Sequence, residues 1–225
     1  MVTAALGALG LPGAMGERVE RGTGTDVVAW EDEFAAMVAE EDALRAEGRW
    51  TRGPQDLLAI IGRRRSELTH NRMLAWFLDP VAAHGLGVAP LQALLALLDV
   101  DQPAQDVLAL ARVEREVRNG PTIADLLVDT DELRVVFEVK LDAPEQRRQA
   151  DRLVDAFDGE GETIFVFLTL DGRSPWTGVV HDDRWLALTW REVLEMMQQV
   201  TMERPPSGDA ATTIAAYLDS LRRIV

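Results

Sequence analysis

The sequence predicts an α/β fold of the α+β, mixed-sheet type, and three observations support this prediction. Apolar residues recur with helical spacing through the first half of the chain, up to about Ala109. Three short runs with a period of two then follow, which is the pattern of half-buried strands. Further along, a helical stripe precedes a nearly continuous apolar run typical of a buried strand. The order helices, three strands, helix, two strands, helices indicates a mixed sheet with helices packed on it.

Helical segments are expected before the strands. The first is strongly acidic and ends at Gly48, where the helical pattern stops. The third ends at Asp79-Pro80, since proline lacks the amide hydrogen that a helix interior needs. The segments cover about 26–48, a short stretch after Pro54, 66–78 and 89–98.

A three-stranded meander is the simplest arrangement of the β-rich runs. The turn Asn119-Gly120-Pro121 separates the first two runs, and four polar residues separate the second from the third. A helix is expected to open at Pro144. The strands cover about 112–117, 122–128, 133–139, 163–170 and 185–189, and closing helices are expected over 191–200 and 210–224.

The chain of 225 residues suits one domain after a loose tail over residues 1–25. Its core is expected at about 63–190, with helical extensions over 26–62 and 191–225. The first 16 residues lack the basic region of a secretory signal, so we expect a cytoplasmic protein without membrane contact, whose start could be Met1 or Met15. The absence of cysteine excludes disulfides, thiolate metal sites and a cysteine nucleophile.

The net charge of −15 argues against binding polyanions through the overall field of the protein. Residues 51–150 are the least acidic part, with 12 basic and 15 acidic residues. Local attraction of a phosphate therefore remains compatible with the charge. The same charge predicts weak non-specific binding of nucleic acid and acidic flanks that are free to meet a protein partner.

Two carboxylates are expected to meet on neighbouring strands. Alternation places Glu138 on the face opposite the core residues of its strand, and Asp125 on the corresponding face of the preceding strand. A two-residue loop between the strands would put these acids diagonal to each other, and a four-residue loop directly opposite. Because like charges facing each other destabilise a sheet, a cation between them is expected, and oxygen ligands suit Mg²⁺ or Mn²⁺. The core face of the earlier strand is expected to carry Ala124, Leu126 and Val128.

Lys140 is the only lysine among 23 basic residues and shares the face of Glu138. An ordinary solvated strand face would explain a bare Glu-x-Lys equally well. Against that explanation, Ile123, Leu127 and Val136 are expected on the same face, which indicates partial burial. A lysine ammonium can position a water molecule, and its pKa can fall on burial, which an arginine cannot match.

The sequence also resembles a known family. Asp125 followed by Glu138-Val139-Lys140 is similar to the D…ExK signature of the PD-(D/E)XK nuclease superfamily. Upstream, the stretch from Glu67 through His70 to Asp79-Pro80, followed by HGLG, resembles a helix and loop of one bacterial branch found near defence and mobile-element genes. Downstream, Gln146 and Gln149 match its Q..Q pattern. The resemblance covers about residues 66–157 and implies a restriction-endonuclease-like core: helix, three-stranded meander, helix, strand.

The resemblance implies metal-assisted hydrolysis of phosphodiester bonds, with Mg²⁺ or Mn²⁺ as cofactor. Asp125, Glu138 and the backbone carbonyl of Val139 would bind the ion, and Lys140 would orient the attacking water. A second ion would be compatible with a third carboxylate nearby.

Other residues would support this site. Glu67 would act on a metal, through water, or as an acid/base partner, and Gln149 would steady the site or the substrate phosphate. Purely structural roles are an open alternative for the histidines and a plain surface turn for the arginines. The weaker candidates for substrate contact are Arg63, Arg64, Arg65, His70, His84 and Gln146.

The resulting hypothesis is a metal-dependent nuclease acting on DNA rather than RNA, with a role in bacterial defence or DNA processing. One alternative is a catalytically inactive module of the same fold that binds a protein partner through its acidic surface. A metal-dependent phosphodiesterase for a nucleotide is a third hypothesis. Assembly as a homodimer is compatible with each of them.

Overall fold

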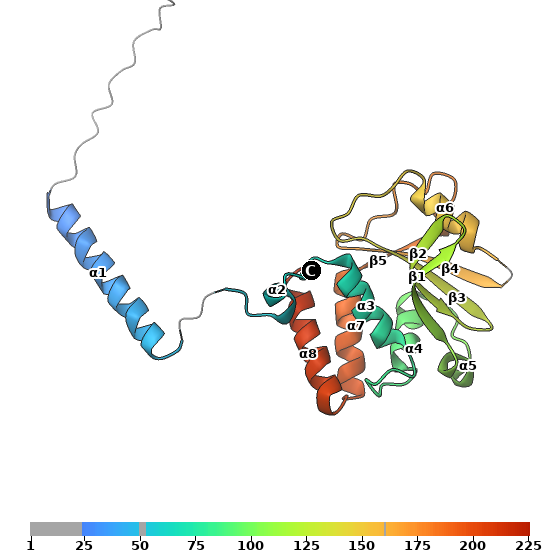
Figure 1. The fold of residues 1–225 in the computed structure, drawn as a ribbon, viewed down its shortest axis with the longest axis horizontal. Helices are drawn as coiled ribbons and strands as arrows, with labels where there is room; N and C mark the ends of the chain where they lie inside the picture. Colours follow the sequence, from blue (N-terminus) through green and yellow to red (C-terminus); the bar gives the residue numbers. More distant parts are fainter. Residues whose placement is uncertain (1–23, 50–52, 160) are drawn as a thin grey trace, which may run out of the picture. The chain divides into compact units, whose positions relative to one another are not determined.

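The computed structural model describes residues 24–49, 53–159 and 161–225 (Figure 1). Most of the tail expected over residues 1–25, including Met15, lies outside these residues. The chain divides into one compact unit that ends at Arg52 and another that begins at Gly53. No helix among the described residues combines the length and the apolar composition that a membrane span requires.

The first unit contains helix α1, Gly24–Ala46, close to the acidic helix predicted over 26–48. An ion pair between Glu41 and Arg45, one helical turn apart, stabilises its last turns. Trp30 and Phe34 stack at a centroid distance of 6.0 Å. Both aromatic side chains are exposed, as is that of Met37, so α1 presents an apolar stripe among acidic residues.

The second unit is built on a five-stranded mixed sheet in the order β1-β2-β3-β4-β5. Antiparallel pairing of the first three strands confirms the predicted meander. The last two strands join it in parallel, each through a helix or a long connection. The strands are β1 Arg112–Asn119, β2 Thr122–Asp129, β3 Leu133–Val139, β4 Glu162–Thr169 and β5 Trp185–Thr189.

Helices cover both faces of this sheet (Figure 1). Helices α3, α4 and α7 pack on one face, and α6 packs on the other. Helix α8 packs on α7 and on α2, so the C-terminus lies beside α2 (Figure 1). The helices are α2 Leu57–Ile60, α3 Glu67–Leu78, α4 Ala89–Leu97, α5 Gln105–Ala109, α6 Gln149–Phe157, α7 Trp190–Glu203 and α8 Gly208–Arg222.

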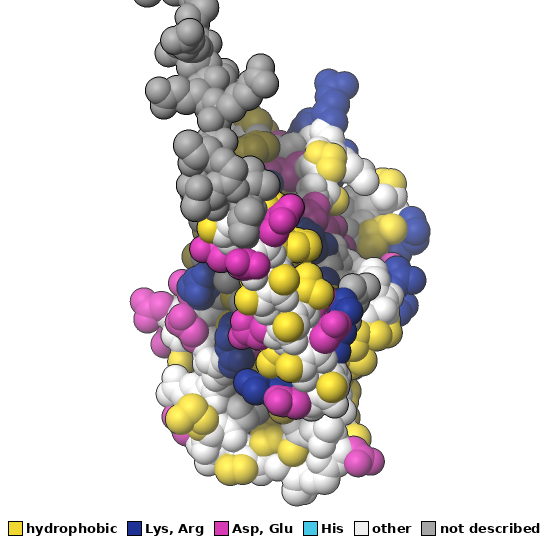
Figure 2. Space-filling model, turned by 90° about the vertical axis from the view of Figure 1, so that its left-hand side faces the viewer, with side chains coloured by type: hydrophobic (Ala, Val, Ile, Leu, Met, Phe, Trp, Pro, Cys, Tyr) yellow, Lys and Arg dark blue, Asp and Glu magenta, His cyan; other side chains and the backbone are white. Residues whose placement is uncertain are grey.

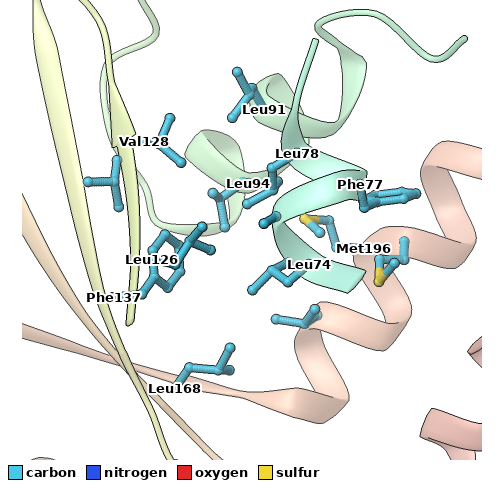
Figure 3. Packing of buried hydrophobic residues seen from close by; sticks show 14 of the residues in the cluster. Leu74, Phe77, Leu78, Leu91, Leu94, Leu126, Val128, Phe137, Leu168 and Met196 are labelled. Carbon is cyan, nitrogen blue, oxygen red and sulfur yellow. The ribbon is translucent and has the colours of Figure 1, made fainter. Parts of the chain in front are cut away.

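Two apolar clusters form the core. In the larger one, Leu74 of α3 and Leu94 of α4 project toward Leu126 and Phe137 of the sheet, whereas Phe77 lies on the other side of α3, near Met196 of α7 (Figure 3). Fully burying each such side chain stabilises the fold by about 1.5–3 kcal/mol. The smaller cluster lies between the other face of the sheet and α6. Among the predicted site residues, Asp125, Glu138 and Gln149 line a cavity that Leu153 of this smaller cluster also lines.

Helix α6 begins later than the sequence indicated. The sequence predicts that this helix begins at Pro144, whereas its first residue is Gln149. Arg148 adopts a left-handed conformation with φ 53°, which separates the preceding loop from the helix. The carboxylate of Glu145 is bonded to another loop and so holds residues 144–148 out of helical geometry. Helix α5 was not predicted, because five residues are too few to show a period.

Candidate active site

Asp125 and Glu138 lie next to each other across β2 and β3. The last paired residues of this ladder are Leu126 and Phe137, and four residues separate Asp129 from its partner Arg134. The longer of the two loop alternatives is therefore the correct one, and the acids face each other one step beyond the ladder. Asp125 Oδ2 accepts a hydrogen bond from the Val139 amide at 2.8 Å. The Val139 amide therefore bonds to a side chain of β2 here instead of to a backbone carbonyl.

The side chain of Asn71 completes this junction. Its Nδ2 donates to the Asp125 carbonyl oxygen at 2.6 Å, so α3 satisfies a backbone group that the ladder leaves free. Asn71 is buried, and its Oδ1 has no hydrogen-bond partner in the described part of the chain. The sequence reasoning missed Asn71, although it is the neighbour of a residue that the motif includes.

Strand β1 is distorted where it passes Asp125. Glu116 has φ 53°, and pairing resumes beyond it between Val117 and Ala124. Opposite this residue, between Ala124 and Leu126, the side-chain alternation of β2 is reversed. Ala124 packs in the smaller cluster with α6, whereas Leu126 packs in the larger one. The prediction that Ala124 shares the core face of Leu126 is therefore wrong, because one left-handed residue opposite Asp125 turns the strand.

Glu138 is almost completely buried, with 1% of its surface exposed. Its Oε1 accepts hydrogen bonds from Lys140 Nζ and Gln149 Nε2, both at 2.6 Å. Its Oε2 is buried and has no partner among the described residues. Burial raises the pKa of Glu138 to about 8, and the neighbouring Asp125 adds to this shift. Burial likewise raises the pKa of Asp125, against the Val139 amide and Lys140, which lower it.

Lys140 extends from the end of β3 into the same cavity. Burial alone would lower its pKa, but the carboxylates of Glu138 and Asp125 outweigh burial, and the pKa of Lys140 is raised. Burial thus acts in the direction that the sequence suggested, but the neighbouring carboxylates decide the net shift of this pKa.

Glu67, the first residue of α3, holds the segment after Lys140. Its Oε1 accepts hydrogen bonds from three successive amides, those of Leu141, Asp142 and Ala143, at 2.7, 3.2 and 3.1 Å. Such a set of amides is a typical anion cradle. This oxygen supports the loop, and Glu67 also lines the candidate cavity, so its expected role toward a metal or as an acid/base partner stays a prediction.

A cavity of about 410 Å³ brings the principal residues together. Gln149 forms its wall from the start of α6, where Oε1 of Gln149 also accepts the Gln146 amide at 2.9 Å. Glu116, which the sequence reasoning missed, also faces the cavity. The predicted site residues that line it are Glu67, Asp125, Glu138, Lys140, Gln146 and Gln149.

The histidines expected to contact substrate have structural roles instead. His70 is fully buried, and its ring nitrogens lie 3.0 Å from Tyr217 Oη and 2.8 Å from the Arg64 carbonyl oxygen. His84 is also buried, with one ring nitrogen 2.9 Å from the Asp79 carbonyl oxygen and the other accepting the Leu86 amide. All four ring nitrogens are occupied within the protein, so neither histidine has one for a substrate.

The three arginines before α3 diverge from one another. Arg64 pairs with the buried Asp56 at the start of α2, and Arg65 pairs with Asp142 in the loop that Glu67 holds. Arg63 has an exposed side chain. None of the three lines the cavity. Arg65 supports the loop indirectly, and Arg64 belongs to the structural junction of α2.

Two carboxylates, an amide and an ammonium thus share one cavity beside the inner strands β2 and β3 of the mixed sheet. A sequence model of the PD-(D/E)XK nuclease superfamily matches residues 55–219, so the chain belongs to this superfamily. The matched region lies entirely in the unit that begins at Gly53. Searches of curated proteins and of solved structures gave no significant match.

Proposed function

We propose that the protein is a metal-dependent nuclease that hydrolyses phosphodiester bonds, in DNA rather than RNA, with a role in bacterial defence or DNA processing. The observation that carries this proposal is the buried Oε2 of Glu138, which has no partner among the described residues and lies beside a second buried acid. An unpaired buried carboxylate oxygen costs about 1–3 kcal/mol or more, so its retention calls for a ligand.

The donor set fits a divalent cation. Within residues 24–49, 53–159 and 161–225, no group of three or more acidic or histidine side chains has metal-binding geometry. The fit therefore rests on Asp125 and Glu138 with a backbone carbonyl, for which Val139 is proposed because its amide is bonded to Asp125. Such hard oxygen donors suit Mg²⁺ or Mn²⁺. When bound, the ion would supply positive charge and Lewis acidity at the phosphate.

The residues of the chain would perform the remaining tasks. Lys140 would donate to the attacking water or to a phosphate oxygen, and its raised pKa favours the charged form that can do so. Gln149 would hold Glu138 in place through their 2.6 Å hydrogen bond. Glu67 would fix the loop after Lys140 and thereby the position of the ammonium.

The overall charge is compatible with this function. On the face drawn in Figure 2, acidic, basic and apolar side chains are interspersed, and no single sign of charge covers it. Attraction of the substrate would therefore be local, and a bound divalent ion would provide much of it. Weak non-specific binding and a strict metal requirement follow.

One observation supports the alternative of an inactive module that binds a protein partner. Helix α1 is acidic and exposes Trp30, Phe34 and Met37 along one side. Exposed apolar stripes of this kind often mark protein contacts. This alternative requires that the cavity carry no activity, so one assay separates the two.

The experiment is a cleavage assay with single- and double-stranded DNA and RNA, in Mg²⁺, in Mn²⁺ and in EDTA. Asp125→Asn and Lys140→Met are the test variants, and Glu132→Gln, an exposed loop acid, is the matched control. We expect metal-dependent cleavage by the wild type and the control, and cleavage reduced by about 100-fold or more in the test variants. Absence of both cleavage and calorimetric metal binding in the wild type would refute the enzyme proposal and favour the binding module.

A further inference from the structure

A second cavity, of about 460 Å³, adjoins the candidate active site. Lys140, Ala143 and Pro144 line both cavities, so the two are separated only by Lys140 and the loop that Glu67 holds. A ligand at Asp125 and Glu138 would have to pass Lys140 to reach this second space. On its far side the wall is formed by Arg173 and Trp176, from the connection between β4 and β5.

Trp176 is an unusual wall residue because 76% of its surface is exposed. The guanidinium carbon of Arg173 lies 4.1 Å from the centroid of the Trp176 ring and 5.1 Å from that of the buried Phe167 ring. The Arg173 guanidinium therefore lies between the exposed Trp176 ring and the buried Phe167 ring. An exposed indole supported in this way presents a flat aromatic surface to the solvent.

Glu145 fixes this arrangement to the loop beside the active site. Its carboxylate is nearly buried, with 3% side-chain exposure, and pairs with Arg173. It also accepts the amides of Trp176 and Thr177, at 3.1 and 3.0 Å, and the Thr177 hydroxyl at 2.7 Å. Four donors from residues 173–177 thus converge on one side chain. The indole is therefore held in a preorganised position, which lowers the entropy cost of binding a ligand there.

We propose that Trp176 is a stacking platform for an unpaired nucleobase next to the scissile phosphate. This inference rests on the proposed nuclease function and defines its substrate class as a strand with a single-stranded stretch at the site. In a duplex, neighbouring base pairs cover both faces of each base, whereas an unpaired base stacks readily on an aromatic ring.

The first test is binding of labelled single-stranded dT and rU oligonucleotides, measured by fluorescence anisotropy in EDTA so that cleavage does not interfere. We expect Trp176→Ala to weaken binding about 10-fold, since stacking on one aromatic side chain contributes roughly that much. Trp176→Phe keeps an aromatic face and should restore most of the affinity. Trp30→Ala, at a tryptophan in α1 that is 68% exposed, is the matched control and should bind as the wild type does.

The second test locates the base. An abasic nucleotide is moved stepwise along the oligonucleotide, and the affinity of the wild type should fall at one position only. Trp176→Ala should lose this position dependence, because the partner of the missing base is gone. Equal affinity of wild type and Trp176→Ala, an abasic scan without position dependence, or no binding of any single strand would each overturn the platform. A protein partner for this loop would produce the first of these results.

These results are independent of catalysis. If single strands bind with the expected dependence on Trp176 but no substrate is cleaved in Mg²⁺ or Mn²⁺, the nuclease proposal fails and the base-binding platform stands. If cleavage is observed with equal efficiency for the wild type and Trp176→Ala on single strands, the platform fails and the nuclease proposal stands.

Discussion

Two buried carboxylates in this protein have nearly equal exposure and opposite electrostatics. Asp56, at the start of α2, is 2% exposed, and Glu138 is 1% exposed. The hydrogen bond from Arg64 lowers the pKa of Asp56 to about 2, whereas burial raises that of Glu138 to about 8. Asp56 also caps α2 by accepting the Ala59 amide at 2.9 Å, and Arg223 lies 3.8 Å away.

The difference separates a structural carboxylate from the one that we propose to be functional. Asp56 joins α2 to the end of α8 and has partners for its charge, as a buried ion should. Glu138 shares its cavity with another acid and keeps one oxygen without a partner in the described chain. Perturbed acids of the second kind gather at functional sites. The two carboxylates are nearly equally buried, so it is their hydrogen-bond and charge partners that distinguish them.

The largest expected effect concerns activity. Lys140→Met removes the cation that pairs with Glu138 and keeps most of the length of the side chain. We expect cleavage to fall about 100- to 1,000-fold, the usual loss for a preorganised charge at a reacting phosphate. Steady-state cleavage in Mn²⁺ measures this effect. Arg64→Met, in the structural region, should keep most of its activity at temperatures where it is folded; an equal loss in both variants would contradict the distinction.

The next effect concerns stability at Asp56. Asp56→Ala removes the cap of α2 and leaves Arg64 without its partner, and we expect a loss of about 2–3 kcal/mol in the free energy of unfolding. Urea denaturation measures it. Asp56→Asn can still cap the helix and should lose less. A change below about 0.5 kcal/mol in the Ala variant would show that the junction is not structural.

The pH dependence of Asp56 has a definite sign. Its folded-state pKa is lowered from 3.8 to about 2, so its contribution is present above pH 3.8 and is lost as the pH falls toward 2. Acid denaturation of the wild type should therefore be steeper in this interval than that of Asp56→Asn.

The pH dependence of the stability that Glu138 contributes should have the opposite sign to that of Asp56, and Glu138→Gln tests it. In EDTA, a carboxyl whose pKa is raised from 4.5 to about 8 stabilises the fold fully below pH 4.5, and this contribution is lost as the pH rises through 8. The amide does not ionise, so at pH 9 the variant should be more stable than the wild type by about 1–2 kcal/mol. At pH 5 the two should differ little. Unfolding curves at both pH values provide the measurement, and a destabilised variant at pH 9 would make Glu138 a second structural acid.

The sequence predicted the strands around this site well. Period-two alternation defined the meander and placed Glu138 and Lys140 on one face of β3, because such a pattern depends only on neighbours along the strand. For the pairing of Asp125 with Glu138, the sequence left two alternatives, diagonal or directly opposite. The choice depends on the length of the loop between the strands, for which the sequence has no strong local signal.

The roles of other residues depend on contacts that are distant in sequence. His70 meets Tyr217, 147 residues away, and the Glu67 carboxylate meets amides 74–76 positions later. No local pattern reveals such partners. The reversal at Ala124 arises from Glu116, a residue type with no preference for the left-handed region, so it could not be anticipated.

The smallest expected effect tests whether backbone strain also distinguishes the region around Glu138 from the region around Asp56. Glu116 at φ 53° faces the cavity, and the left-handed conformation costs a residue with a Cβ about 1–2 kcal/mol. Glu116→Gly and Glu116→Ala remove the same charge but differ in this cost. We expect the Gly variant to be more stable than the Ala variant by about 1 kcal/mol in urea denaturation.

The matched pair is Glu114→Gly and Glu114→Ala, two positions earlier in β1, where the residue has no positive φ. There the order should be reversed, because glycine loses more conformational entropy in an ordinary strand. Arg148, at φ 53° directly before Gln149, is a second left-handed residue beside the cavity, whereas none lies within residues 53–65 around Asp56 except glycine. If both pairs gave the same order, Glu116 would carry no strain, and the turn of β1 opposite Asp125 would cost nothing to maintain. The expected reversal would instead mean that the site region maintains an unfavourable backbone as well as an unpaired acid, and that packing elsewhere in the fold offsets both.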